Sequence, residues 1–231
     1  MADLLTYQLT NYSMHIAITG NIGAGKTTLA EQLAAYYGWE VLYEAVEGNP
    51  YLADFYADMP RWSFNLQVYF LNSRFAQVKK IMAIRRANEA NPDHPHTVVQ
   101  DRTIYEDAAI FARNLHESER MSERDYQTYL ALFENMVSLI HPPDLMIYLR
   151  ADLPKLREQI RKRGRSFEQS ISDEYLDSLN RLYEEFVLTY REGDLLILDV
   201  NETDYTGNSA DFAQVIRQVD AQLESLAVKS R

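Results

Sequence analysis

The sequence predicts an α/β fold in which a five-stranded parallel sheet carries helices on both faces. Short apolar segments alternate with longer helical segments along the chain. The apolar segments are continuous rather than alternating in polarity, which is typical of strands buried on both faces. A glycine-rich loop joins the first apolar segment to the helix after it, and this order of strand, turn and helix is typical of phosphate-binding proteins.

The first half of the chain begins with a strand over 14–19 and a helix over 28–37. This helix ends at Gly38, because glycine readily adopts the left-handed conformation of a helix C-cap. A second short strand covers 40–43. Apolar residues then recur at spacings of four and three over 61–87, which predicts one long amphipathic helix.

The second half repeats the alternation of strands and helices. A strand over 97–100 ends at Asp101, and Thr103 and Glu106 form a capping box that opens the next helix. The remaining elements are strands over 144–149 and 195–198 and helices over 122–140, 152–163, 171–190 and from about 209 onward.

Composition excludes several classes of function. The net charge is −11, from 34 acidic and 23 basic residues, which argues against a protein that binds nucleic acid through a basic surface. Disulfides, cysteine metal sites and thiol nucleophiles are excluded because the sequence has no cysteine. The N-terminus does not resemble a signal peptide, and no stretch approaches the ~18 apolar residues that cross a bilayer. We therefore expect a cytoplasmic protein with no membrane partner, a single domain over 1–231 with a loose tail over 1–13.

The glycine-rich loop fits the P-loop pattern G-x-x-x-x-G-K-[ST]. Its glycines let backbone N–H groups turn inward around an anion, and the following helix adds the positive end of its dipole. Lys26 can reach the outer phosphates of a nucleotide, and the Thr27 hydroxyl can bind Mg²⁺. The residues expected to bind the nucleotide here are Gly20, Asn21, Ile22, Gly23, Ala24, Gly25, Lys26, Thr27 and Thr28.

Ligands of a parallel sheet gather beyond the carboxyl ends of its strands. This edge is expected to hold the glycine-rich loop, Glu44, Asp101, Arg102, Arg150 and Asp199. Glu44 can accept a proton from an attacking hydroxyl, although it also fits a solvated acid at a strand end. Arg102 can pair with Glu44 or with phosphate. Asp101 can hold Mg²⁺ or cap a helix, and Asp199 is a rival for the metal.

Two further groups of residues are candidates for binding. Gln67 and Arg74 lie two turns apart on the long helix, where they can read the edge of a base or form a solvated row. Five cations surround Gly164, namely Arg157, Arg161, Lys162, Arg163 and Arg165. Such a cluster suits the negative end of a helix dipole, and it also fits an arginine-rich lid that closes over phosphate.

These motifs together resemble the deoxyribonucleoside kinase family, which includes deoxycytidine, deoxyguanosine and deoxyadenosine kinases. The matching segments are 44–46, 61–64, 101–107, 163–168 and 198–202, with Tyr56, Gln67, Arg74 and Phe111 between them. Ala45 replaces the proline of the family's Glu-Pro-Val motif. The resemblance implies a P-loop kinase fold that transfers phosphate from ATP, with Mg²⁺, to the 5′-hydroxyl of a deoxyribonucleoside.

The resemblance also implies roles for single residues. Glu44 is the general base, and Tyr56 and Glu168 hold the 3′-hydroxyl of the sugar. The residues expected to bind the nucleobase are Gln67, Arg74, Asp107 and Phe111. Arg102 is expected to contact the substrate and to support the general base. The residues expected to neutralise phosphate charge are Lys26, Arg102 and the lid residues Arg161, Arg163 and Arg165. Thr27 and Asp101 hold Mg²⁺, and Asp199 becomes a structural residue.

The Arg74–Asp107 pair implies a substrate with an amino-bearing base, because thymidine-preferring relatives lack this pair. Deoxyadenosine is the favoured substrate, with deoxyguanosine or deoxycytidine next. Family members pair through long apolar helices, so the resemblance also implies a homodimer through helices 61–87 and 122–140.

Three other functions fit parts of the sequence. A nucleoside monophosphate kinase would need an arginine-rich acceptor site for a second phosphate, whereas Tyr56 and Gln67 suit a neutral nucleoside. A GTPase switch protein would carry an Asn-Lys-x-Asp motif, which the sequence lacks. An ATPase that acts on DNA is disfavoured by the acidic charge balance.

Overall fold

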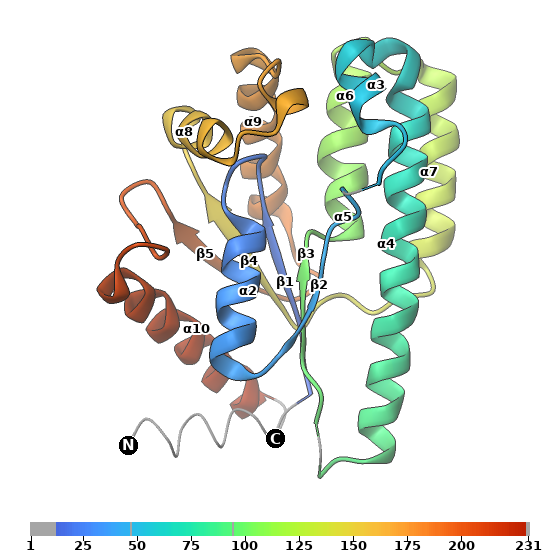
Figure 1. Ribbon diagram of the computed structural model, residues 1–231. Coiled ribbons are helices and arrows are strands. Elements are labelled where there is room, and N and C mark those ends of the chain that lie inside the picture. Colours follow the sequence, from blue (N-terminus) through green and yellow to red (C-terminus); the bar gives the residue numbers. More distant parts are fainter. Residues whose placement is uncertain (1–12, 47, 94, 230–231) are drawn as a thin grey trace.

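The computed structural model describes residues 13–46, 48–93 and 95–229. Within these residues, five strands form one parallel sheet in the order β2-β3-β1-β4-β5 (Figure 1). The strands are β1 (His15–Gly20), β2 (Glu40–Leu42), β3 (Val98–Asp101), β4 (Leu145–Arg150) and β5 (Asp194–Asp199). The predicted five-stranded parallel sheet is confirmed, whereas the expected tail over 1–13 lies, apart from Ser13, outside the described residues.

The long predicted helices are all present. They are α2 (Lys26–Tyr37), α4 (Met59–Ala90), α7 (Glu123–Val137), α8 (Leu153–Arg163), α9 (Asp173–Thr189) and α10 (Ser209–Lys229). The predicted capping box opens α5 (Ile104–Glu106), and Gly38 ends α2 with a φ of 76°. Helix α5 continues through the π-helical turn η1 (Asp107–Ala112) into α6 (Arg113–Glu117). Shorter elements that the sequence did not predict are α3 (Leu52–Ala57) and the 3₁₀ turn η2 (Ser166–Glu168).

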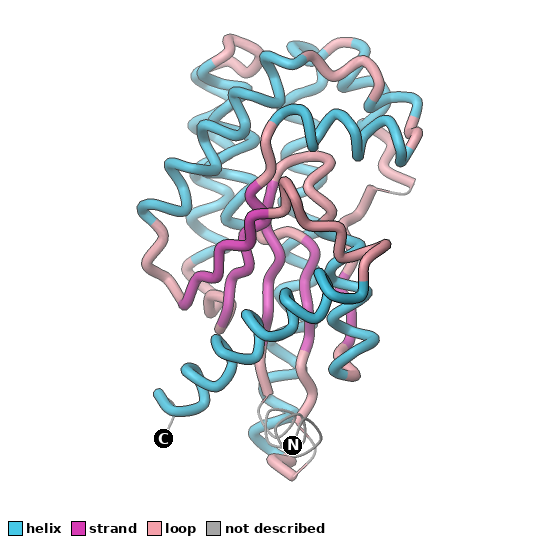
Figure 2. The backbone as a smooth tube through the Cα atoms, turned by 90° about the vertical axis from the view of Figure 1, so that its left-hand side faces the viewer, coloured by secondary structure: helices cyan, strands magenta, loops and turns pink. Residues whose placement is uncertain are grey.

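Different helices cover the two faces of the sheet. On one face, Leu29 of α2 and Val219 of α10 share a buried cluster with Ile16 of β1. In the view of Figure 2, α10 crosses in front of the strands. On the other face, Tyr148 of β4 packs in a second cluster with Leu179 of α9. Burial on both faces explains why the strands are continuous apolar runs.

The two longest helices on the β2 side of the sheet, α4 and α7, lie side by side (Figure 1). Phe64, Val68 and Leu71 of α4 share a cluster with Tyr129 and Phe133 of α7. At these positions, the apolar stripe that predicted the long helix packs α4 against α7.

Strand register places the glycine-rich loop (Gly20–Thr28), called the phosphate loop below, beside the end of β3. Ile18 of β1 pairs with Asp101 of β3, and the Arg102 N–H donates to the Ile18 carbonyl at 2.9 Å. Parallel strands end at the same edge of a sheet, so the loop after Gly20 and the Asp101–Arg102 pair become neighbours.

One titratable side chain is buried within the sheet itself. His15 of β1 is 5% exposed, and its Nε2 lies 2.9 Å from Oε1 of Gln100 on β3. Burial lowers the pKa of His15 to about 4, a net value that includes a smaller rise from the hydrogen bond to Gln100 and a still smaller lowering by Arg85. The fold therefore favours the neutral imidazole.

We predict that His15 makes the protein less stable as the pH falls from about 6.5 to about 4. In this interval the unfolded chain binds a proton at His15 and the native protein does not, so lowering the pH favours unfolding by up to about 3 kcal/mol. Urea unfolding of the wild type and of His15→Gln at several pH values measures this term. The stability advantage of the wild type over the variant should shrink towards pH 4, and a difference that is independent of pH would contradict the prediction.

Candidate active site

The phosphate loop is closed by glycines that other residues cannot replace. Gly25 has a φ of 93°, and a Cβ built there would lie 2.1 Å from the Tyr205 hydroxyl. Gly23 has a φ of 87°, and its Cβ would lie 2.8 Å from the Leu156 carbonyl oxygen. Both positions need the left-handed conformation and close backbone approach that glycine allows. The loop is thus held tightly between α8 and the segment after β5.

Lys26 is buried at the start of α2, and its Nζ donates to the Asn21 carbonyl oxygen at 2.9 Å. Burial, helped by the nearby Arg102 and opposed by Asp101 and Glu44, lowers the pKa of Lys26 to about 7. The nearby carboxylates therefore do not offset the burial of the positive charge, and an anion beside Lys26 would stabilise its ammonium form.

A pocket opens beside the glycine-rich loop, and not every predicted loop residue reaches it. The pocket lining includes Ile22, Gly23, Gly25, Lys26, Thr27 and Thr28 but not Gly20, Asn21 or Ala24. Instead, the Asn21 side chain donates to the Leu176 carbonyl at 2.8 Å and to Asn180 at 2.6 Å, both on α9. The Asn21 side chain therefore ties the loop to α9, which leaves its predicted role in nucleotide binding to the backbone of the loop.

A pocket of about 880 Å³ opens beside this loop. It brings together most of the residues that the sequence singled out, namely Glu44, Tyr56, Gln67, Asp101, Arg102, Asp107, Phe111, Arg163, Arg165 and Glu168. These residues come from six separate segments of the chain, which is the strongest sign that the pocket is the functional site.

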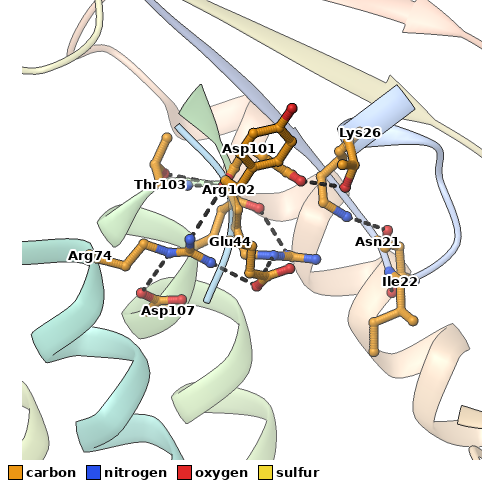
Figure 3. A network of polar contacts seen from close by, with 12 residues as sticks. Asn21, Ile22, Lys26, Glu44, Arg74, Asp101, Arg102, Thr103 and Asp107 are labelled. Atoms are coloured by element: carbon orange, nitrogen blue, oxygen red, sulfur yellow. Dashed lines mark hydrogen bonds and ion pairs between the residues drawn. The ribbon is translucent and has the colours of Figure 1, made fainter. Parts of the chain in front are cut away.

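The inner wall of the pocket is a network of buried charges around Glu44 (Figure 3). Its Oε1 accepts a hydrogen bond from Arg74 Nη2 at 2.7 Å and forms an ion pair with Arg102 Nε at 3.0 Å. Burial opposes ionisation of Glu44, but Arg102, Arg74 and Lys26 outweigh it and lower its pKa to about 2. Glu44 is therefore a carboxylate at neutral pH, and Arg102 pairs with it rather than remaining free for phosphate alone.

Arg74 joins Glu44 to the far side of the pocket. Its side chain is 1% exposed, and its Nε forms an ion pair with Asp107 Oδ2 at 3.4 Å. Its Nη1 donates to the Asp101 carbonyl oxygen at 3.3 Å. Burial raises the pKa of Asp107 to about 7 even though Arg74 acts against this. The Arg74–Asp107 pair that the family resemblance implied is present.

Asp101 and Thr27 offer oxygens that suit a hard divalent cation. The Thr27 hydroxyl donates to Asp101 Oδ2, and Asp101 Oδ1 is buried with no hydrogen-bond partner. Burial raises the pKa of Asp101, whereas Lys26 lowers it. Among the described residues, no group of three or more His, Cys, Asp or Glu side chains is arranged for a metal, so phosphate oxygens and water would have to complete the site. The donor set fits Mg²⁺ on these terms.

Another part of the pocket lining carries aromatic rings and an amide. The rings of Tyr56 and Phe167 stack at 5.8 Å, and the Phe111 ring lies under the Arg102 guanidinium at 4.6 Å. Gln67 is buried on α4, and its Oε1 has no hydrogen-bond partner within the described part of the chain. An unpaired buried amide oxygen costs free energy unless a ligand supplies a donor.

The arginine-rich segment between α8 and α9 closes one side of the pocket. Arg163 Nη2 and Arg165 Nη1 form ion pairs with the buried Glu168 at 2.6 and 3.3 Å. Arg161 is exposed and does not line the pocket, whereas Lys162 does. Arg157 Nη2 donates to the Ile171 carbonyl, so this cation braces the segment rather than facing the pocket.

Two residues expected at the same edge of the sheet point elsewhere. Arg150 Nη2 pairs with Glu184 of α9 at 2.7 Å, and Asp199 Oδ1 accepts a hydrogen bond from the Asn201 N–H at 3.0 Å. Neither Arg150 nor Asp199 lines the pocket. Arg150 and Asp199 do end β4 and β5 at the predicted edge of the sheet, but these strands lie on the side of the loop away from Glu44. Their side chains therefore do not reach the pocket, and nothing in this position favours Asp199 over Asp101 for the metal.

Sequence reasoning missed two residues that contact Arg102 from behind the pocket. Glu106 was interpreted as a helix cap, which it is, but its Oε1 also accepts from Arg102 Nη1 at 3.1 Å. The Tyr183 hydroxyl, on α9, also contacts both Arg102 and Glu106. No local signal marks Tyr183, because its partners lie 77 and 81 residues earlier in the chain.

Comparisons with known proteins agree with this geometry. The profile of the deoxynucleoside kinase family matches residues 16–224. The chain is 39% identical over 212 residues to a deoxyadenosine kinase of Dictyostelium discoideum, covering 92% of this chain and 80% of that protein. It is 37% identical to a deoxyadenosine/deoxycytidine kinase of Bacillus subtilis, covering 88% of this chain and 90% of that protein.

A solved structure is similar as well. The deoxyadenosine kinase of M. mycoides with bound dATP superposes with a TM-score of 0.76 at 30% identity, over 90% of this chain and 99% of that one. In the described residues, no helix has the length and apolar character needed to span a membrane.

Proposed function

The chain belongs to the deoxynucleoside kinase family and phosphorylates deoxynucleosides, and we propose how its residues divide this reaction and which nucleoside it prefers. The observation that carries the proposal is the position of Glu44, between the phosphate loop and the Arg74–Asp107 pair (Figure 3). A general base at this position can accept the proton of a hydroxyl that attacks a phosphate bound by the loop. Family membership favours this reaction over a nucleoside monophosphate kinase, a GTPase switch or a DNA-acting ATPase.

ATP is the proposed donor, with its phosphates on the loop. Backbone N–H groups at the start of α2 face the anion, and Lys26 leaves the Asn21 carbonyl to contact the outer phosphates. The negative charge of the phosphates holds Lys26 in its ammonium form. Thr27 and Asp101 would hold Mg²⁺, which when bound neutralises charge that develops on the phosphate oxygens.

Glu44 is the proposed general base for the 5′-hydroxyl. Its low pKa keeps the carboxylate ionised, so it can accept a hydrogen bond from the hydroxyl at any physiological pH. Phosphoryl transfer passes through a loose transition state, so a weak base that orients the hydroxyl and takes the proton as the P–O bond forms is sufficient. Arg102 and the lid residues Arg163 and Arg165 neutralise the charge that develops on the transferred group.

The nucleoside is placed in the part of the pocket that Tyr56, Gln67 and Phe111 line. Tyr56 and Glu168 hold the 3′-hydroxyl, and the Phe111 ring stacks on the base. The Gln67 amide pairs with a donor and an acceptor on the edge of the base, and Asp107 accepts a hydrogen bond from an exocyclic amine. The unpaired Oε1 of Gln67 and the Arg74–Asp107 ion pair support this arrangement.

This pairing favours deoxyadenosine. Adenine presents an exocyclic amine next to a ring acceptor, which matches the Gln67 amide and the Asp107 carboxylate. Cytosine carries the same pair on a smaller ring, whereas thymine would place a carbonyl oxygen against Asp107. The names of the relatives in Dictyostelium discoideum and Bacillus subtilis support the same order.

We predict that Glu44→Gln lowers kcat by about 10²–10⁴-fold, the range expected when a general base is lost. The amide keeps the size of the side chain but cannot take the proton. Steady-state assays with saturating ATP and deoxyadenosine measure the effect. Glu184→Gln is the matched control, because Glu184 also pairs with an arginine but lies outside the pocket. Near wild-type turnover of Glu44→Gln would refute the assignment.

We predict that kcat/KM is highest for deoxyadenosine among the four deoxynucleosides and about 10²-fold or more lower for thymidine, because the thymine carbonyl cannot donate the hydrogen bond that Asp107 accepts from an exocyclic amine. A steady-state panel of the four nucleosides measures this order. Gln67→Ala should lower kcat/KM for deoxyadenosine through KM. A preference for thymidine would contradict the proposed pairing.

We also propose a cytoplasmic homodimer that forms through α4 and α7. Leu132 and Leu139, in the predicted segment 122–140, are 37% and 63% exposed, which supports an apolar contact there. Light scattering should give about twice the chain mass of 26.8 kDa. The double variant Leu132→Glu, Leu139→Glu should be monomeric, whereas Leu188→Glu, at an exposed leucine of α9, should not change the mass. A monomeric wild type would refute the dimer.

A further inference from the structure

Arg102 is held on two sides, and only one of them is the pocket. Its Nε pairs with Glu44 at 3.0 Å, while its Nη1 donates to Glu106 Oε1 at 3.1 Å and to the Tyr183 hydroxyl at 2.5 Å. Within the described residues no protein group accepts a hydrogen bond from its Nη2. The guanidinium is thus fixed at two nitrogens and leaves the third for a ligand.

The backbone of Arg102 also needs this support. Its φ is 71°, in the left-handed region that residues other than glycine rarely occupy. Such a conformation costs free energy and persists only where surrounding contacts enforce it. Because the side chain is only 5% exposed, its position is decided by Glu44, Glu106, Tyr183 and the Phe111 ring.

Glu106 is a fully buried carboxylate whose two oxygens are both occupied. Oε1 accepts from Arg102 and from the Tyr183 hydroxyl, the latter at 2.8 Å. Oε2 accepts from the Thr103 N–H at 2.8 Å and so completes the capping box of α5. One carboxylate therefore fixes both the Arg102 side chain and the start of the helix that continues into η1, which carries Asp107 and Phe111.

Tyr183 holds its hydroxyl rigidly in place. The ring is fully buried, stacks on Tyr148 at 5.7 Å and meets the edge of Phe111 at 6.5 Å. With the ring held on two sides, the hydroxyl can serve as a fixed point that accepts from Arg102 and donates to Glu106. Neither Glu106 nor Tyr183 lines the pocket, so neither has a use in direct binding of substrate.

We propose that Glu106 and Tyr183 are positioning residues for phosphoryl transfer, which hold the Nη1 end of Arg102 so that Nε faces Glu44 and Nη2 remains available to the transferred phosphate. The inference rests on the proposed role of Arg102 in the reaction. A small rotation of the guanidinium would separate it from Glu44 or from the phosphate, and misplacement of this size lowers turnover more than it lowers binding.

Tyr183→Phe tests the proposal, because it removes the hydroxyl and keeps the stacked ring. We expect kcat to fall about tenfold, with KM for ATP and deoxyadenosine changed by less than about twofold. Tyr148→Phe is the matched control. It removes a hydroxyl from the partner ring of the same stack, but that hydroxyl contacts Glu184 rather than Arg102, so kcat should be unchanged. Equal kcat values for the wild type and Tyr183→Phe, or equal losses in both variants, would overturn the proposal.

A double-mutant cycle with Arg102→Lys separates positioning from a general structural role. Lysine lacks the planar fork that Tyr183 and Glu106 hold, so Tyr183→Phe should cost less than about twofold in kcat on the Arg102→Lys background. Losses that add independently would overturn the inference, because Tyr183 would then act other than through Arg102. Wild-type turnover of Arg102→Lys would instead refute the proposed role of Arg102 itself, and the inference with it.

Glu106→Gln provides a second variant of similar size. The amide can still accept from the Thr103 N–H, but it loses the charge that faces Arg102. A fall in kcat of about tenfold or more, with KM nearly unchanged, supports the proposal. Urea unfolding of every variant shows whether the protein assayed is folded, and a kcat equal to that of the wild type in folded Glu106→Gln would overturn it.

Discussion

The shared carboxylate of Glu44 ties together the walls of the pocket. Arg74 reaches it from α4 and Arg102 reaches it from the end of β3, and both guanidinium groups are almost fully buried. A charge buried in protein is tolerated only when it is paired and hydrogen-bonded, so each of these groups depends on the others. These ion pairs therefore hold the long helix, the central sheet and the loop after β2 at fixed positions around the pocket.

This arrangement depends on the topology of the sheet. β1 lies next to β3, and the pairing of Ile18 with Asp101 sets the phosphate loop beside the Asp101–Arg102 turn. β2 borders β3 on its other side and delivers Glu44 to the same edge. Three strands that are separated in the sequence by crossover helices thus meet at one edge, as parallel sheets require.

Helix α9 links the donor and acceptor halves of the site. Near its start, Leu176 and Asn180 accept hydrogen bonds from Asn21 of the phosphate loop. Two turns after Leu176, Tyr183 contacts Arg102. One rigid helix therefore sets the distance between the glycine-rich loop and Arg102.

The sequence by itself determined the features whose signals are local. The phosphate loop is a contiguous motif, the strands are continuous apolar runs, and both the capping box at Thr103 and the C-cap at Gly38 depend on residues within one turn. The family resemblance added the acceptor residues Glu44, Gln67 and Asp107, all of which line the pocket.

Only the tertiary structure decided where side chains at strand ends and on helix surfaces point. Asn21 turned to α9 and Arg150 turned to Glu184, although both stand next to residues of the site. Tyr183 joined Arg102 across 81 residues, and Glu106 added an ion pair to its local role as a cap. The physical reason is that a buried charge or amide takes whichever partner the packed helices bring within reach, and that choice is made between distant segments rather than along the chain.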